Sequence, residues 1–133
     1  MIVLFGCAST RKSDILPSFT LNGELRNDLI QNDIPKYGIN SPDGCVVLGE
    51  ISLNIVIFGE DSIHGIVIDS KTNEAVPYAT VQLYFKTICD SVVINTDGDG
   101  SFNSEISCQI REVEVKYIGY RTLIVLLSGF RSK

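Results

Sequence analysis

His64 is the only histidine in the chain and therefore its best candidate for acid–base chemistry. Glu60 and Asp61 stand just before it and could orient its imidazole, as a carboxylate does in a catalytic triad. A triad also needs an activated nucleophile, and no serine of this sequence occupies a Gly-x-Ser-x-Gly turn. A histidine at the start of a strand is more often a surface or edge residue. We therefore predict no catalytic residue.

The run Asp97-Gly98-Asp99-Gly100 spaces two carboxylates as a calcium-binding loop does. An EF-hand loop that begins at Asp97 would need a glutamate at its twelfth position, and that position is Cys108. The same residues suit a tight turn, with Asp at its first position and a left-handed Gly100 at its fourth. Zinc hydrolases usually use two or three histidines, and this chain has one. We predict a turn, no metal and no cofactor.

Three tyrosines, Tyr84, Tyr117 and Tyr120, could form a patch that binds a ligand. In strands, tyrosine more often packs against the core with its hydroxyl at the rim. An exposed apolar patch would mark an interaction site, and the sequence alone does not reveal burial. Ligand binding by these tyrosines therefore stays open at this point.

The composition is that of a globular protein, with 44% hydrophobic and 20% charged residues. A formal net charge of −5 argues against nucleic acid as a partner, because phosphate binding needs clustered Lys and Arg. No apolar run approaches the roughly 20 residues that a membrane-spanning helix needs. At 133 residues the chain is expected to form one domain.

Leu4-Phe5-Gly6-Cys7 resembles a bacterial lipobox, in which the cysteine becomes lipidated after cleavage. Only six residues precede Cys7 and none is basic, so a complete signal would need a start further upstream. The alternative is an ordinary apolar N-terminus with a free cysteine. We expect Cys7 to be a lipidation site, with the membrane contacted only through that anchor.

Residues 1–45 are predicted to be this lipobox-like start followed by an irregular arm or tether. Asn22 could cap a short helix that places Leu25, Leu29 and Ile30 on one face. Four residues that break regular structure follow, namely Pro35, Gly38, Pro42 and Gly44. Regular structure is expected only after this region.

Residues 46–128 are predicted to form a β-sandwich with its core at 62–128. The apolar stretch from Val46 to Phe58 is expected to add an edge strand. Six further strands are expected near residues 63–69, 79–85, 91–96, 101–106, 112–117 and 122–127. Strands at this spacing without intervening helices indicate an all-β, antiparallel sandwich of about seven strands.

Four short motifs follow one another between residues 65 and 120. They run from Gly65 to Asp69, from Pro77 to Val81, from Thr96 to Phe102 and from Tyr117 to Tyr120. Their order and spacing resemble the carboxypeptidase-regulatory-like domain, which has a transthyretin-like (prealbumin-like) β-sandwich fold. The positions that carry the resemblance are Gly65, Val67, Asp69, Pro77, Ala79, Val81, Thr96, Asp97, Gly100, Phe102, Tyr117, Gly119 and Tyr120. The resemblance covers about half of the chain.

In that family these positions are structural, so the resemblance implies no catalytic residue. Such domains extend outer-membrane nutrient receptors, accompany zinc carboxypeptidase domains, or form short envelope proteins, and this chain resembles the free-standing type. The leading expectation is a non-catalytic module with a structural or protein-interaction role, located in the periplasm or at the outer membrane. The alternative is a module that binds peptide or glycan for an uptake system, and a hydrolase is a distant third.

An envelope location would permit disulfides, and Cys89 with Cys108 is the tempting pair. A two-residue hairpin loop at Gly98-Asp99 would place them opposite each other. A type I turn with a bulge at Gly100 would instead place Asp97 opposite Ser101 and Cys89 on the other side of the sheet. The bulged register gives the better core, because it gathers Val92, Ile94, Phe102 and Ile106 on one face. We therefore predict no Cys89–Cys108 disulfide, with Cys108 pointing inward as a small hydrophobe.

Overall fold

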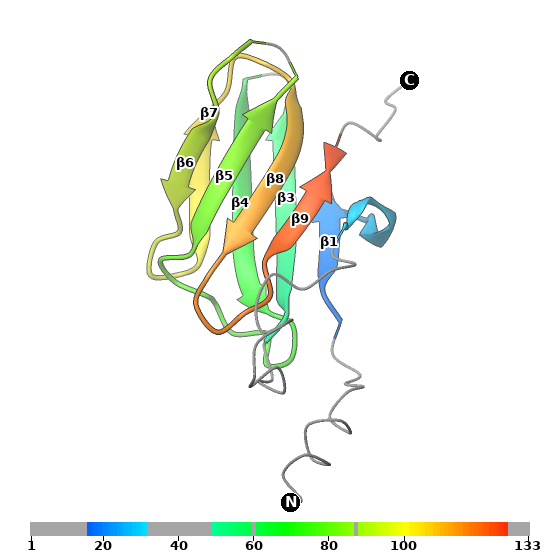
Figure 1. Ribbon diagram of the computed structural model, residues 1–133, viewed down its shortest axis with the longest axis vertical. Coiled ribbons are helices and arrows are strands. Elements are labelled where there is room, and N and C mark those ends of the chain that lie inside the picture. Colours follow the sequence, from blue (N-terminus) through cyan, green and yellow to red (C-terminus); the bar gives the residue numbers. More distant parts are fainter. Residues whose placement is uncertain (1–15, 32–48, 60, 87, 128–133) are drawn as a thin grey trace, which may run out of the picture.

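The protein is a sandwich of two β-sheets, seen in a computed structural model that describes residues 16–31, 49–59, 61–86 and 88–127 (Figure 1). One sheet has five strands in the order β2-β1-β3-β4-β7, and the other has four in the order β6-β5-β8-β9. The strands are β1 (Ser18–Leu21), β2 (Glu24–Leu25), β3 (Ile51–Phe58), β4 (Ser62–Asp69), β5 (Thr80–Phe85), β6 (Val92–Asn95), β7 (Ser101–Glu105), β8 (Ile110–Lys116) and β9 (Leu123–Leu126). All pairs are antiparallel except β1 with β3. The predicted all-β sandwich is confirmed.

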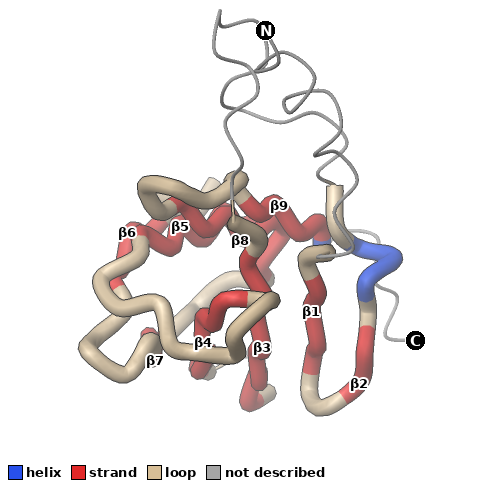
Figure 2. The backbone as a smooth tube through the Cα atoms, turned by 90° about the horizontal axis from the view of Figure 1, so that it is seen from below, coloured by secondary structure: helices blue, strands red, loops and turns tan. Residues whose placement is uncertain are grey.

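Alternation of apolar and polar residues explains why these segments are strands and which side they bury. In β5, Val81, Leu83 and Phe85 are buried, whereas the residues between them are partly exposed. The same alternation holds along β4, where Ile63 and Val67 point into the core. Figure 2 shows β5, β6 and β9 in one layer and β3, β4 and β7 in the other. The buried side chains of both sheets meet between these layers and form one hydrophobic core.

The prediction that the stretch before Phe58 forms an edge strand was wrong. β3 lies inside the five-stranded sheet, between β1 and β4. Its inward residues Ile51, Leu53 and Ile55 are at most 1% exposed, as expected for a strand with neighbours on both sides. The predicted start of this strand, residues 46–48, lies outside the described residues.

The irregular arm predicted for residues 8–45 also needs correction, because part of it belongs to the sandwich. Asn22 does not cap a helix. Asn22 and Gly23, at φ 53° and 86°, form the two-residue turn that joins β1 to β2. Phe19 of β1 is fully buried, which explains why this hairpin docks against β3. The remainder of the predicted arm, residues 8–15 and 32–45, and the lipobox-like start before it lie outside the described residues.

The residues after β2 close one side of the sandwich. The 3-10 helix η1 (Asn27–Leu29) buries Leu29, and the chain then reaches the edge of β9. Ile30 forms a bridge with Val125, and the Gln31 amide donates to the Ile124 carbonyl at 2.8 Å. This segment therefore joins the two sheets and covers the outer edge of the four-stranded one.

The predicted turn at Asp97 to Gly100 is present. The Gly100 amide donates to the Asp97 carbonyl at 3.0 Å, and the Asp97 amide donates to the Ser101 carbonyl at 2.9 Å. Gly100 has φ 74°, and a Cβ there would lie 2.7 Å from the Val67 carbonyl oxygen, so both conformation and space require glycine. The Asp97 carboxylate further accepts the amides of Asp99 and Ser101.

The register argument assumed that the strands on either side of this turn, β6 and β7, pair with each other, and they do not. β6 pairs with β5 in one sheet, and β7 pairs with β4 in the other. The turn is thus a crossing between the two layers. The predicted inward set is nevertheless correct, because Phe102 and Ile106 are buried and Val92 and Ile94 pack against the core.

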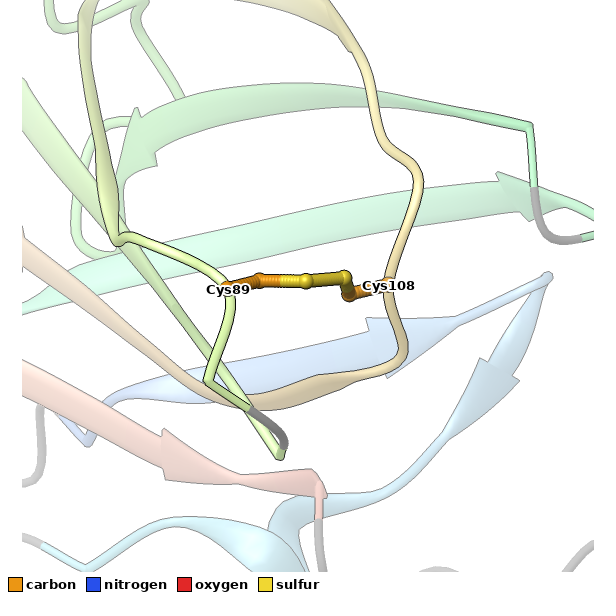
Figure 3. The surroundings of a disulfide bond; sticks show 2 residues. All are labelled: Cys89 and Cys108. Atoms are coloured by element: carbon orange, nitrogen blue, oxygen red, sulfur yellow. A yellow bond between two sulfur atoms is a disulfide. The ribbon is translucent and has the colours of Figure 1, made fainter.

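The prediction of no disulfide between Cys89 and Cys108 was wrong, since the structure joins these two residues (Figure 3). Cys89 lies in the loop between β5 and β6, and Cys108 lies in the loop between β7 and β8. Their Cα atoms are 6.5 Å apart, within the range that disulfides span. The error has a physical cause. Because β6 and β7 belong to different sheets, the loop before β6 and the loop after β7 meet across the end of the sandwich. The disulfide closes a ring of the chain that contains β6 and β7. Because these strands belong to different sheets, the bond helps to hold the two layers together.

Candidate functional site

The predicted motif residues Gly65 and Phe102 are partners across β4 and β7. The Phe102 ring lies on Gly65, and a Cβ at that glycine would overlap the ring atoms. An aromatic ring that covers a glycine on a neighbouring strand supplies the apolar contact that glycine lacks. Both residues are buried, so this pair belongs to the core.

Asp69 and Tyr120, which are far apart in the sequence, form a short hydrogen bond at one end of the sandwich. The Tyr120 hydroxyl donates to Asp69 Oδ2 at 2.5 Å, while Asp69 Oδ1 accepts the amides of Lys71 and Thr72. The hydroxyl, together with these amides, lowers the pKa of Asp69. The carboxylate in turn raises the pKa of Tyr120 to about 12. This pair ties the end of β4 to the turn before β9.

The other residues of the last motif hold the same end of the sandwich. The Gly49 amide donates to the Gly119 carbonyl at 2.9 Å, and Gly119 has φ 89°. A Cβ at Gly49 would lie 2.7 Å from the Tyr120 ring, so the ring lies directly on that glycine. Tyr117 packs against Tyr120 with ring centroids 5.9 Å apart. These contacts give Tyr117, Gly119 and Tyr120 structural roles.

A partly buried ion pair between Glu50 and Arg121 lies next to these contacts. Arg121 Nη2 is 3.1 Å from Glu50 Oε2. Burial raises the pKa of Glu50, and the charge and hydrogen bond of Arg121 oppose that rise. The pair therefore serves to hold residue 50 against residue 121 rather than to act as a free acid or base.

Pro77 begins a turn that Thr96 holds in place. The buried Thr96 hydroxyl donates to the Val76 carbonyl at 2.9 Å and accepts the Ala79 amide at 2.8 Å. Tyr78, between them, has φ 59° and an exposed side chain. Sequence reasoning did not single out Tyr78, because a left-handed tyrosine has no local signature.

Replacing Tyr120 by phenylalanine should lower the free energy of unfolding at neutral pH by about 1 kcal/mol, the value of a partly exposed charge-assisted hydrogen bond. The pKa of Tyr120 is raised by folding, so its contribution is complete below pH 10 and lost as pH rises through about 12. Folding lowers the pKa of Asp69, so the hydrogen bond also stops stabilising the protein in acid, as the pH falls through the lowered pKa of this carboxyl group. Urea unfolding of both proteins between pH 3 and 11 measures the difference. A difference that is constant across that range would contradict the assignment.

The tyrosines considered as a ligand patch are not brought together. Tyr117 and Tyr120 lie at the end of the sandwich. Tyr84 lies on β5, where its hydroxyl donates to Glu114 and its ring lies 5.6 Å from the Arg111 guanidinium. The proposed patch of three tyrosines is therefore not formed.

His64 is hydrogen-bonded to a neutral side chain of the neighbouring strand. Its Nδ1 lies 2.6 Å from Asn103 Oδ1. Both residues line an open cavity of about 290 Å³, together with Phe58, Ser62 and Glu105. Within the described ranges, no three residues of the metal-ligating types stand close enough to share an ion. This cavity can take an uncharged or basic side chain.

The outward surface of the five-stranded sheet is nearly free of charge, and we call it the outer face. Its residues, from β1, β3, β4 and β7, are Ser18, Thr20, Ser52, Asn54, Val56, Phe58, Ser62, His64, Ile66, Ile68, Ser101, Asn103 and Glu105. Glu105 is the only acidic or basic side chain among them apart from the histidine. By contrast, Glu112, Glu114 and Lys116 lie on the outward side of β8 in the other sheet.

Polar groups on the outer face bond mainly to one another. The Ser18 hydroxyl donates to Ser52 at 2.9 Å, and Ser52 and Ser70 share a hydrogen bond of 2.7 Å. Thr20 likewise donates to Asn54 on the neighbouring strand. Apolar side chains lie between these hydrogen-bonded polar groups, and among them Val56 is 37% exposed and Phe58 is 55% exposed. The outer face thus combines exposed apolar groups with hydroxyls that are already bonded.

Comparison with known proteins identifies no similar protein. A scan against protein-family models, a search of curated proteins and a search of solved structures each find no match to this chain. None of the helices in the described ranges has the length and apolar character needed to cross a bilayer.

Proposed function

We propose that the chain is a non-catalytic β-sandwich module of a cell-envelope protein that holds another protein through its outer face. The near-absence of charged side chains from that face, where Glu105 is the one acidic residue, carries the proposal. Charged residues, Lys and Glu above all, are depleted where protein surfaces are buried by partners, because removing a charge from water is costly. In a chain with 27 acidic and basic residues in total, a sheet face with one such residue calls for an explanation.

Two features of the outer face lower the cost of covering it. The hydroxyls of Ser18 and Ser52 already have partners on neighbouring strands, so little hydrogen bonding to water is lost on burial. Phe58 and Val56 gain from leaving water, by about 25 cal/mol for each Å² of apolar surface removed. The outer face extends over four neighbouring strands, an area that a folded protein covers better than a small ligand does. This width favours a protein partner over the alternative of a peptide or glycan.

The envelope location is part of the proposal. A disulfide between Cys89 and Cys108 persists in oxidising compartments, and such bonds are rare in the cytosol. The lipobox-like Cys7, which lies outside the described residues, would supply the anchor. Expressed from a gene with its native upstream start, Cys7→Ser should move the protein from the membrane to the soluble fraction. Unchanged fractionation would remove the anchor from the proposal.

The resemblance to the carboxypeptidase-regulatory-like domain is also proposed. Its support is that Gly65, Gly100 and Tyr120 occupy positions where the fold requires those residue types. A shared fold does not define a shared activity, so the function rests on the outer face.

Replacing Ile66 by lysine tests the outer face at its centre. Ile66 is a partly exposed residue of β4 that pairs with Asn54 and Ser101. A buried lysine at an interface should reduce recovery of the partner from solubilised native envelopes at least ten-fold, while the stability changes by less than about 1 kcal/mol. Ile124→Lys is the matched control, since Ile124 is a partly exposed β-branched residue on the outward side of β9. Equal recovery with both variants would remove the outer face as the contact surface.

A further inference from the structure

β7 ends the five-stranded sheet, and half of its main-chain groups point away from that sheet. In an antiparallel ladder, residues alternate between bonded and non-bonded pairs. The Val67 amide donates to the Gly100 carbonyl, and the Ile106 amide donates to the Asp61 carbonyl, which fixes the phase of the alternation. Phe102 and Ser104 therefore face β4 with their main chain, whereas Asn103 and Glu105 present theirs outward.

No strand in the described part of the chain covers this edge. The Glu105 carbonyl accepts a bond from the Ser104 hydroxyl at 3.0 Å. The amide and carbonyl of Asn103 and the amide of Glu105 have no bond to any other described residue. The outer edge of β9, by contrast, is already partly covered, because the Gln31 amide donates to the Ile124 carbonyl there.

The open cavity beside His64 lies along the same edge. Asn103 and Glu105 line it from β7, and Phe58, Ser62 and His64 line it from the strands behind. Glu105 is exposed and is its only carboxylate. The exposed Phe58 ring supplies an apolar surface. An edge with outward main-chain groups and a side-chain cavity next to it is the arrangement that accepts an added strand.

We propose that β7 binds an extended segment of a partner protein as an additional strand, and that a lysine or arginine of this segment enters the cavity. The proposal rests on the protein-binding function above and specifies how the partner engages. Along this edge the Asn103 amide can donate, the Asn103 carbonyl can accept and the Glu105 amide can donate. These groups are spaced as the main chain of an added strand requires. A basic residue opposite Glu105 is favoured as a cross-strand pair, and its aliphatic stem would lie against Phe58.

The test uses the oxidised, ¹⁵N-labelled protein and the synthetic peptide acetyl-Thr-Val-Lys-Val-Lys-Val-Thr-amide. Saturable amide shift changes are expected at Asn103 and Glu105, with slower hydrogen exchange at both. The same peptide with its central valine replaced by proline should produce neither, because proline cannot donate to the ladder. A peptide with glutamate in place of both lysines should bind at least ten-fold more weakly.

Two variants separate the edge from the side chain at position 103. Asn103→Pro removes an outward amide that makes no bond to β4, so the fold should persist while peptide affinity falls at least ten-fold. Asn103→Ala removes the bond to His64 but keeps the amide, so it should retain the main-chain pairing. Circular dichroism checks that both variants remain folded.

Absence of shift changes at saturating peptide would overturn the proposal. So would changes centred on Val93 and Asn95 of β6, the edge of the other sheet, or equal affinity of the proline and alanine variants. Failure of the proposed function is distinguishable, because Ile66→Lys tests the outer face independently of the edge. Loss of the native partner with Ile66→Lys but not with Asn103→Pro would leave the module's function standing and remove strand addition.

Discussion

Replacing both Cys89 and Cys108 by alanine should lower the free energy of unfolding by about 3 kcal/mol. The two residues are 19 apart in the sequence, and the disulfide closes the chain around β6, the crossing turn and β7. Without it the unfolded chain regains the freedom of that loop, which is the main source of disulfide stabilisation in the chain-entropy model. Because β6 and β7 belong to different sheets, the loss should also loosen the contact between the two layers on that side.

Urea unfolding under oxidising and reducing conditions measures this effect, in a background with Cys7 and Cys45 replaced by serine. The parent should lose about 3 kcal/mol on reduction, and the melting temperature should fall by roughly 10 °C for a domain of this size. The double alanine variant should not respond to reductant. Equal stability of the parent in both conditions would show that the two sulfurs are not joined.

Gly65→Val should destabilise the protein by about 2–3 kcal/mol, the cost of overpacking a core that cannot move aside. Any side chain at residue 65 enters the space of the Phe102 ring, and both residues are buried in strands of the same sheet. The ring cannot turn outward without exposing apolar surface. The β propensity of valine, which would favour this change elsewhere in a strand, is therefore outweighed.

A double-mutant cycle with Phe102→Leu identifies the cause of the loss. If the ring is the obstacle, Gly65→Val should cost at least about 1 kcal/mol less in the leucine background. Gly98→Ala is the control, because a Cβ there meets only the Tyr78 hydroxyl at an ordinary 3.6 Å. Equal costs of Gly65→Val in both backgrounds would mean that something other than Phe102 restricts residue 65.

Local patterns were sufficient to predict the strands whose residues alternate between core and solvent. The alternation along β5 and β8 indicated both the strands and their buried faces, and the turn at Asp97 followed from Asp and Gly at fixed positions. The Asn22-Gly23 turn carried an equally specific hairpin signal. The two strands that it joins are only four and two residues long, so the alternation that would support this hairpin signal is short.

Features that depend on the arrangement of whole sheets could not be predicted in this way. A hairpin and a crossing between layers begin with the same turn, so Asp97 and Gly100 do not reveal that β6 and β7 separate. The error about Cys89 and Cys108 followed from that ambiguity. The outer face was visible as a run of uncharged alternate residues in β3 and β4. The sequence does not show whether these residues face solvent or pack against another part of the chain, because that depends on the tertiary structure.

Site-specific photo-cross-linking in native cells tests the central claim, that the outer face holds a protein partner. A photoreactive residue at Asn54, Ile66 or Asn103 should give one discrete protein adduct, while the same residue at Gln82 or Glu112 on the other sheet should give none. The adduct should be lost when Ile66→Lys is introduced into the Asn54 probe. Adducts of equal yield from both sheets, or from neither, would contradict the account.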